Sequence, residues 1–132
     1  MFINKAEVKD MKSILIVDDE VDITEILKQA FEQRKWDVTV AHSVDEALKL
    51  HKEINPQVVL SDIRMPGSGG IGIATAIRNM RANRAIVFLM TGFADLSNQP
   101  LKNLGVNKVF QKPFDLIQLI TEIEDSLTQK AS

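Results

Sequence analysis

Short apolar runs alternate with amphipathic segments along the whole chain. The apolar runs predict five strands, at residues 13–17, 36–41, 57–61, 85–90 and 107–111. The amphipathic segments predict helices at about residues 21–33, 43–53, 71–81 and 115–127. Strands that alternate with helices along the sequence are typical of a parallel sheet with helices on both faces. The pattern therefore predicts an α/β fold.

Local signals mark where individual helices begin and end. Ser43 is followed three residues later by Glu46, which is the capping-box pattern and predicts a helix start. Asn55–Pro56 ends that helix. Residues 94–104 stand where a further helix is expected, but Pro100 inside the segment disfavours a regular one. We therefore expect this segment to be short or irregular.

No repeat or linker divides the predicted elements, so we expect one domain at residues 13–128. Residues 1–12 are then an N-terminal extension and residues 129–132 a C-terminal tail. Met11–Lys12 resembles a translation start just before the first strand. We therefore expect Met1–Asp10 to be dispensable for folding and for metal binding.

Composition excludes several classes of function. The net charge is −2 with both signs scattered along the chain, which offers no continuous basic surface for a nucleic acid. The chain has no cysteine, which rules out disulfides and thiolate metal sites. Its apolar runs are too short to span a membrane, and residues 1–13 lack the apolar core of a signal peptide. We therefore expect a cytoplasmic location.

Polar side chains stand where the predicted strands end. Asp18 and Asp19 follow the first strand, Asp62 the third, Thr91 the fourth and Lys112 the fifth. In open parallel sheets, ligands bind beyond the carboxyl ends of the strands, where the topology reverses. We therefore expect three carboxylates, a hydroxyl and an ammonium group at one edge of the sheet.

Three clustered carboxylates repel one another, and Lys112 supplies only one compensating charge. A hard divalent cation fits the remaining deficit, because Mg²⁺ prefers oxygen ligands. Phosphoryl transfer depends mainly on positioning and charge neutralisation, and a carboxylate can form a covalent acyl phosphate. The set therefore predicts Mg²⁺-dependent phosphoryl transfer to an aspartate.

Four motifs, taken together, resemble the receiver domains of two-component response regulators. They are Asp18–Asp19 after ILIV, Asp62 within SDIRMPG, Thr91–Gly92 after FLM, and Lys112–Pro113–Phe114. The similarity extends over about residues 12–128, in the same order and spacing. The resemblance implies a flavodoxin-like, doubly wound sheet of five strands in the order 2-1-3-4-5.

The resemblance also implies a role for each matching residue. Asp62 would accept the phosphoryl group from a histidine kinase or a histidine phosphotransfer protein. Thr91 would hydrogen-bond one phosphoryl oxygen, Lys112 would pair with another, and a cis peptide bond at Pro113 would aim Lys112 inward. The implied Mg²⁺ ligands are Asp18, Asp19, Asp62 and the backbone carbonyl of Arg64. Phosphorylation would then shift a conformational equilibrium and the binding of a downstream protein, or of a second copy of the chain.

The sequence departs from the receiver pattern at two positions. Receivers commonly carry an aromatic residue three positions before the lysine, where this chain has Val109. The neighbouring Phe110 cannot substitute, because successive strand residues face opposite sides of the sheet. Pro100 is the second departure, in a segment of the face through which receivers commonly signal. The chemistry matches the family, whereas the output mechanism does not follow its usual form.

Other interpretations stay open. Each site residue taken alone has a structural explanation, such as helix capping for Asp18 and Asp19. The chain could be a receiver-like docking module that does not use phosphorylation, or part of a larger regulator. A small phosphohydrolase with an aspartate nucleophile would need DxDx[TV] after the first strand, and a flavodoxin-like cofactor protein would need a less acidic first loop.

Charged and imidazole side chains outside the strand ends have plain interpretations. We place His42 and His51 beside the second helix, away from the predicted edge, as surface or rim residues. We interpret Glu122, Glu124 and Asp125 of the last helix as a solvated face.

Overall fold

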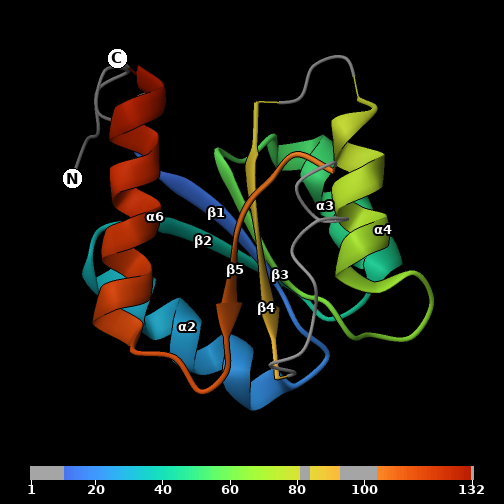
Figure 1. Ribbon diagram of the computed structural model, residues 1–132, viewed down its shortest axis with the longest axis horizontal. Coiled ribbons are helices and arrows are strands. Elements are labelled where there is room, and N and C mark those ends of the chain that lie inside the picture. The colour runs from blue at the N-terminus through green and yellow to red at the C-terminus, as the bar shows by residue number, and fades with distance from the viewer. Residues whose placement is uncertain (1–10, 81–83, 93–103, 132) are drawn as a thin grey trace.

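Five parallel strands form one sheet in the order β2-β1-β3-β4-β5, as predicted (Figure 1). The structure, a computed structural model, describes residues 11–80, 84–92 and 104–131. The strands are β1 Ser13–Val17, β2 Asp37–Ala41, β3 Val58–Asp62, β4 Ile86–Thr91 and β5 Val106–Gln111. The described helices are α2 Val21–Gln33, α3 Val44–Ile54, α4 Gly69–Arg78 and α6 Leu116–Ala131.

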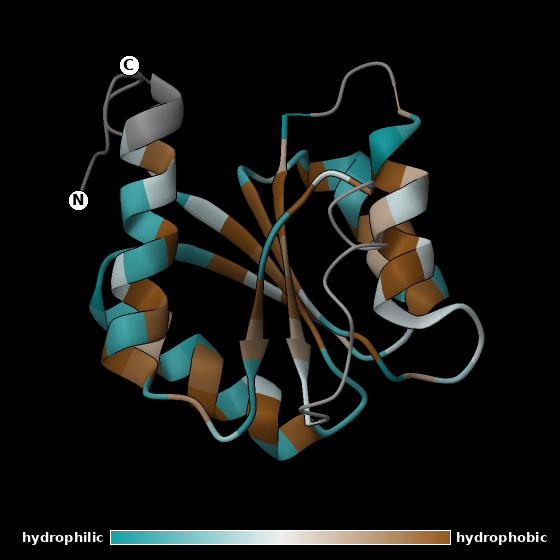
Figure 2. Cartoon of the chain, in the orientation of Figure 1, coloured by the Kyte–Doolittle hydropathy of each residue, from teal (hydrophilic) through white to brown (hydrophobic). Residues whose placement is uncertain are grey.

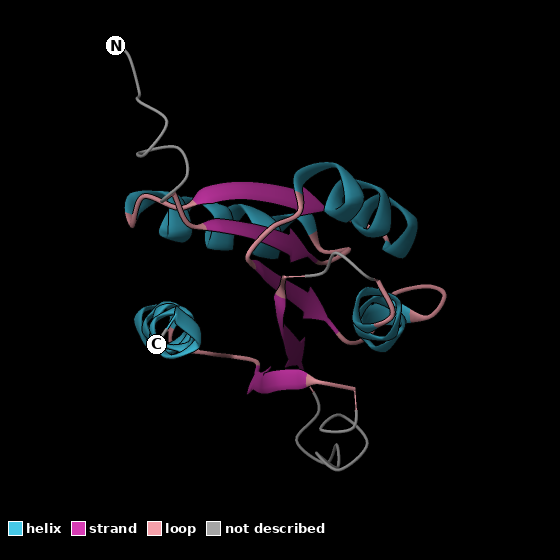
Figure 3. Ribbon diagram, turned by 90° about the horizontal axis from the view of Figure 1, so that it is seen from above, coloured by secondary structure: helices cyan, strands magenta, loops and turns pink. Residues whose placement is uncertain are grey.

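Helices cover both faces of the sheet, as Figures 1 and 3 show. Helices α2 and α6 pack against one face, and α3 and α4 pack against the other. Along β1 the side chains alternate between the two layers: Ile14 and Ile16 join the α2/α6 core, whereas Leu15 and Val17 join the α3/α4 core. Burial on both faces explains why β1, β3 and β4 are continuous apolar runs, seen as hydrophobic central strands in Figure 2.

Most predicted boundaries agree with the structure, and the differences have local causes. Strand β2 begins one residue after Trp36, because the Trp36 N–H donates to the Phe31 carbonyl oxygen (3.1 Å) in the turn that follows α2. Helix α4 begins at Gly69, two residues earlier than predicted, since glycine has a low helix propensity and hides a helix start. Helix α4 ends at Arg78, before its predicted end near residue 81, and Leu104 lies in a turn. The rest of the helix expected at residues 94–104, with Pro100, lies outside the described residues. So does the proposed dispensable segment 1–10.

Side-chain caps define two of the helix starts. The Ser43 hydroxyl accepts the Glu46 N–H (3.1 Å), which confirms the predicted cap of α3. The Glu46 carboxylate reaches one residue further back than a capping box would, and accepts the His42 N–H (2.7 Å). At α6, the Asp115 carboxylate accepts the Gln118 N–H (2.9 Å). Each cap satisfies a backbone donor that the first helical turn leaves unpaired.

Glu124 joins α6 to the opposite end of the sheet from the predicted site. Its carboxylate accepts hydrogen bonds from the Arg34 guanidinium and from the buried Trp36 indole (3.1 Å), and Lys12 lies 3.9 Å away. The Glu124 side chain is only 16% exposed. The interpretation of this residue as part of a solvated face is therefore wrong, because three basic or donor groups from distant segments converge on it.

Within the part of the chain that the structure describes, no helix has the length and hydropathy required to cross a membrane.

Candidate functional site

The predicted site residues all lie at the carboxyl edge of the sheet. Asp18 and Asp19 follow β1, Asp62 ends β3, Thr91 ends β4, and Lys112 follows β5. The strands are in parallel register, with Val17 opposite Ser61 and Asp62 opposite Met90. Parallel strands deliver their carboxyl ends to one edge, so residues up to 94 positions apart in sequence meet there.

Three carboxylates converge at this edge. Oxygen atoms of Asp18, Asp19 and Asp62 all lie within 4.8 Å of one another. Asp18 is fully buried and Asp62 is 7% exposed, whereas Asp19 is exposed to solvent. The donor set consists of oxygen atoms with a formal charge that Lys112 offsets only in part. It therefore fits a hard divalent cation such as Mg²⁺.

Lys112 bridges the two buried acids. Its Nζ lies 2.9 Å from Asp18 Oδ2 and 3.7 Å from Asp62 Oδ1, and its side chain is 18% exposed. The Lys112–Pro113 peptide bond is cis, as the resemblance implied. The Lys112 N–H donates to the Thr91 carbonyl oxygen (2.7 Å), which ties the end of β5 to the end of β4. The ammonium group is thus held inside the acidic cluster.

Both carboxylate oxygens of Asp18 already have partners within the protein. Oδ2 accepts from Lys112, and Oδ1 accepts the Glu20 N–H (2.9 Å). Asp19 is exposed to solvent beside this pair. Mg²⁺ usually binds through one or two carboxylates together with water and phosphate oxygens. Asp19 is thus the more accessible of these two carboxylates to a cation.

Burial and neighbouring charges perturb the titration of Asp62. Burial is the largest cause and raises the pKa of Asp62 above its ordinary value, and the charge of Asp18 raises it further. Lys112 lowers this pKa, Asp19 raises it, and the Ile63 N–H lowers it, but the net direction is upward. Burial, more than the neighbouring charges, therefore disfavours the ionised form of the Asp62 carboxylate.

Lys112 stays charged in the site. Burial, the largest single influence, acts to lower the pKa of Lys112. The hydrogen bond and charge of Asp18, together with the charges of Asp62 and Glu20, outweigh burial and raise the pKa above its ordinary value. The ammonium form is consequently the one present at neutral pH.

Thr91 is buried at the end of β4, beside the acidic cluster. Arg64 is exposed and lies two residues after Asp62. Their positions at the edge agree with the sequence analysis. The roles expected for the Thr91 hydroxyl and the Arg64 carbonyl stay predictions.

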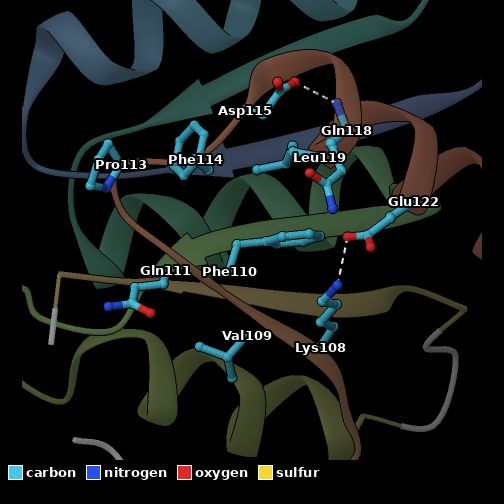
Figure 4. A pocket seen from close by; sticks show the side chains of 10 residues that line it. All are labelled: Lys108, Val109, Phe110, Gln111, Pro113, Phe114, Asp115, Gln118, Leu119 and Glu122. Atoms are coloured by element: carbon cyan, nitrogen blue, oxygen red, sulfur yellow. Dashed lines mark hydrogen bonds and ion pairs between the residues drawn. The ribbon is translucent and has the colours of Figure 1, made fainter. Parts of the chain in front are cut away.

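The two residues that replace the usual aromatic arrangement point in opposite directions from β5 (Figure 4). Val109 packs against the α3/α4 core, whereas Phe110 packs into the α2/α6 core and stacks on Phe88 with ring centroids 5.8 Å apart. The expectation that Phe110 cannot take the place of Val109 is confirmed. Phe110 also lines a pocket of about 250 Å³ between β5 and α6, closed on one side by the Lys108–Glu122 ion pair (2.7 Å).

A second, apolar pocket of about 400 Å³ adjoins the acidic cluster. Its lining residues come from α2 and from the segment after β5: Ile23, Ile26, Leu27, Lys112, Pro113, Phe114 and Leu116. Lys112 borders both the pocket and the carboxylates. Ile26 is 51% exposed, so apolar surface reaches solvent next to the site.

Each histidine departs from its prediction in one respect: His42 is partly exposed, as expected of a rim residue, but it does not lie away from the site edge. Ala41 pairs with Val17 in the parallel β1–β2 ladder, so His42 follows β2 at the same edge as Asp18, with its Nε2 3.1 Å from the buried Thr24 hydroxyl. The rule that ligands bind beyond the carboxyl ends of parallel strands, applied also to the second strand, would have identified His42. His51 is buried in α3 and is not a surface residue. It lies one turn from Ala47, on the apolar side of the helix.

Comparison with known proteins agrees with this geometry. The family model for the response regulator receiver domain matches residues 14–124. The regulatory protein AtoC of Escherichia coli is 37% identical over 117 residues, which cover 86% of this chain and 25% of that protein. The chain spans between a quarter and about half of the length of the curated relatives that it matches.

Solved structures show the same fold. A receiver domain protein from Methanospirillum hungatei is 27% identical, with a TM-score of 0.85 over 92% of this chain and 98% of that one. The response regulator TrrA of Thermotoga maritima, solved in complex with Mg²⁺ and BeF, is 31% identical, with a TM-score of 0.74 over 87% of this chain and 98% of that one. With the family model matching most of its length, the chain belongs to the response regulator receiver domain family.

Proposed function

We propose that Asp62 accepts a phosphoryl group in a Mg²⁺-dependent reaction and that the chain works as a switch in a two-component phosphorelay. The observation that carries the proposal is the buried Asp18–Asp62 pair, bridged by Lys112 and flanked by the exposed Asp19. Membership of the receiver family and the Mg²⁺–BeF complex of the similar TrrA protein support it.

The proposed step is an in-line transfer to Asp62. One carboxylate oxygen of Asp62 forms a bond to the donor phosphorus, and the bond from phosphorus to the donor histidine nitrogen breaks. The leaving imidazole keeps the electron pair of that bond. Lys112, 3.7 Å from Asp62, is placed to pair with a phosphoryl oxygen, and the Thr91 hydroxyl can donate to another.

Asp18, Asp19 and Asp62, together with the Arg64 carbonyl, would hold Mg²⁺. When bound, Mg²⁺ supplies the positive charge that neutralises the phosphoryl oxygens. The convergence of three carboxylates on a single ammonium group supports this assignment.

A phosphoryl donor must bring its histidine to the carboxyl edge of the sheet. The apolar pocket between α2 and the segment after β5 adjoins Lys112 and offers surface that a protein donor can bury while it reaches Asp62. This placement supports a histidine kinase or a histidine phosphotransfer protein as the partner. The downstream target is a protein that distinguishes the two conformations, and no direct contact with nucleic acid is needed for the switch.

The chain acts on itself and not on a released substrate, so we assign it as a signalling receiver and not as an enzyme. Its chemistry comprises uptake of the phosphoryl group and hydrolysis of the resulting acyl phosphate. We place the receiver domain at residues 13–128, in the cytoplasm, either alone or as part of a longer regulator.

The test is incubation with Mg²⁺ and a small acyl phosphate donor, followed by intact-mass measurement of wild type and of Asp62→Asn. We expect a gain of one phosphoryl group in wild type only, abolished by a chelator. No gain in a wild type that binds Mg²⁺ would favour a docking module that does not use phosphorylation. Steady turnover of a generic phosphate ester would instead favour a phosphohydrolase.

A further inference from the structure

Helix α4 begins directly against the backbone that follows Asp62. The Gly70 N–H donates to the Ile63 carbonyl oxygen (3.1 Å). A Cβ atom added at Gly70 would lie 2.4 Å from the Asp62 carbonyl oxygen and 3.1 Å from both the Asp62 carbonyl carbon and the Ile63 Cα. All three are backbone atoms, which cannot rotate away. Only a residue without a side chain fits at this position.

Three hydrogen bonds hold the backbone that follows Asp62. The Ser61 hydroxyl donates to the Asp62 carbonyl oxygen (3.0 Å), and the Ile63 N–H donates to the Met90 carbonyl oxygen (2.9 Å). The third is the bond from Gly70 to the Ile63 carbonyl. The first two bonds, from β3 and to β4, hold the Asp62–Ile63 peptide, and the third, from α4, holds the Ile63–Arg64 peptide that follows it.

We infer that Gly70 is a positioning residue for the phosphoacceptor. Its missing side chain lets the first turn of α4 pack against the Asp62–Ile63 peptide and hydrogen-bond the Ile63–Arg64 peptide, and together these contacts aim the Asp62 carboxylate and the Arg64 carbonyl at the site. The inference rests on the proposed function, because it explains how Asp62 and the predicted metal ligands are held. Gly70 itself touches neither the metal nor the phosphoryl group.

Gly70 allows a clean test, whereas Gly69 does not. Gly69 has φ +63°, so any side chain there strains the backbone as well as meeting the Ile63 carbonyl oxygen. Gly70 lies in the helix without a positive φ. Alanine at an unhindered helical position favours helix formation over glycine. A loss of function in Gly70→Ala would therefore come from contact with the Asp62–Ile63 peptide.

Gly72 provides a matched control in the same helix. A Cβ atom at Gly72 would lie 1.9 Å from the Ser68 Oγ and 2.2 Å from the Ser68 Cβ, so it is equally crowded. The displaced residue, however, is Ser68 in the loop before α4, not the Asp62–Ile63 peptide. Gly70→Ala and Gly72→Ala thus impose similar overpacking on α4 but push on different neighbours.

The experiment compares wild type, Gly70→Ala and Gly72→Ala well below their melting temperatures. Mg²⁺ affinity is measured by calorimetry, the rate of phosphorylation by a small acyl phosphate at saturating Mg²⁺ by intact mass, and backbone positions by amide NMR without metal. Changes around a metal site typically weaken binding by about 10–100-fold. We expect Gly70→Ala to lose about tenfold in Mg²⁺ affinity, to be phosphorylated more slowly, and to shift the Ile63 and Arg64 amide resonances. We expect Gly72→Ala to keep the wild-type affinity and rate.

The outcomes separate this inference from the proposed function. A Gly70→Ala variant with wild-type affinity and rate overturns the inference alone, and so does an equal loss in Gly72→Ala. If wild type neither binds Mg²⁺ nor takes up a phosphoryl group, the proposed function is overturned, and the positioning role of Gly70 is overturned together with it. Should Gly70→Ala fail to fold, Ser61→Ala decides, because it removes the hydrogen bond to the Asp62 carbonyl without adding an atom. We expect that variant to bind Mg²⁺ less tightly than wild type, and unchanged binding would refute the positioning role.

Discussion

Asp62→Asn should make the metal-free protein more stable at neutral pH. Burial, the charge of Asp18 and the charge of Asp19 raise the pKa of Asp62, so the ionised side chain costs free energy in the folded state. The amide of asparagine has a similar shape and no charge. The substitution therefore removes the free-energy cost of holding this charge in the folded protein.

The size of the expected gain in stability depends on opposing contributions to the free energy of the ionised Asp62 side chain. With an effective dielectric constant of about 20, repulsion between the Asp18 and Asp62 carboxylates over at most 4.8 Å is at least about 3.5 kcal/mol. Attraction between Lys112 and Asp62 over 3.7 Å offsets it with about 4.5 kcal/mol. These terms nearly cancel, so burial decides the sign. Incompletely compensated burial of a polar group costs about 1–3 kcal/mol, which is the gain that we expect for Asp62→Asn.

The effect should depend on pH in a defined direction. The folded-state pKa of Asp62 lies above its ordinary value of 3.8. Stability linked to the protonated form is thus fully present below the ordinary pKa and is lost as the pH rises through the folded-state pKa. Wild type should gain stability on acidification from pH 7, and Asp62→Asn should lack this contribution. The difference between the two should be largest near neutral pH.

Urea unfolding in the presence of a chelator measures the effect, followed by the fluorescence of the single, buried Trp36. Asp125→Asn serves as the control, because Asp125 is an exposed carboxylate on α6 outside the site, and we expect its effect to stay within about 0.5 kcal/mol. Added Mg²⁺ should stabilise wild type and narrow its difference from Asp62→Asn. A variant that is no more stable than wild type at pH 7, or a difference in stability that does not vary with pH, would contradict the expected cost of burying the ionised Asp62 carboxylate.

Three further predictions concern other parts of the structure. Glu124→Ala should lower the free energy of unfolding by about 1–3 kcal/mol, because the buried Trp36 indole loses its acceptor, while the rate of phosphorylation by a small acyl phosphate stays unchanged. Lys112→Met should lower the free energy of unfolding at pH 7 in chelator by about 3 kcal/mol, because it removes the cation that pairs with the buried carboxylates. Mg²⁺ should restore part of this loss in the same urea titration. An unchanged free energy of unfolding would contradict the pairing. Ile26→Asp should slow phosphoryl transfer from a histidine kinase that phosphorylates wild type, but should not slow phosphorylation by a small acyl phosphate. Ile117→Asp is the control, because Ile117 is 71% exposed and lies outside the apolar pocket. Equal effects of the two substitutions would argue against docking of the kinase at this pocket.

The fold and the grouping of the candidate site residues could be predicted from the amino-acid sequence. Apolar runs and helical spacing are local properties of the chain, and their alternation leaves a parallel sheet as the way to bury both faces. Once the strands are known, a general rule brings their carboxyl ends together, so Asp18, Asp19, Asp62, Thr91 and Lys112 could be grouped without coordinates. The cis peptide bond at Pro113 and the opposite orientations of Val109 and Phe110 could likewise be predicted, from the family pattern and from strand alternation.

Which of the clustered groups contact one another depends on tertiary packing. Lys112 lies closer to Asp18 than to Asp62, a distinction of less than an ångström that no spacing in the sequence encodes. Nothing in the sequence around Glu124 distinguishes it from a solvated acid, yet it contacts residues that lie 88 and 90 positions away. The fit of Gly70 against the Asp62 carbonyl depends on where α4 meets β3. These features arise from packing between distant segments, where positions within an ångström determine contact, and local patterns carry no information at that scale.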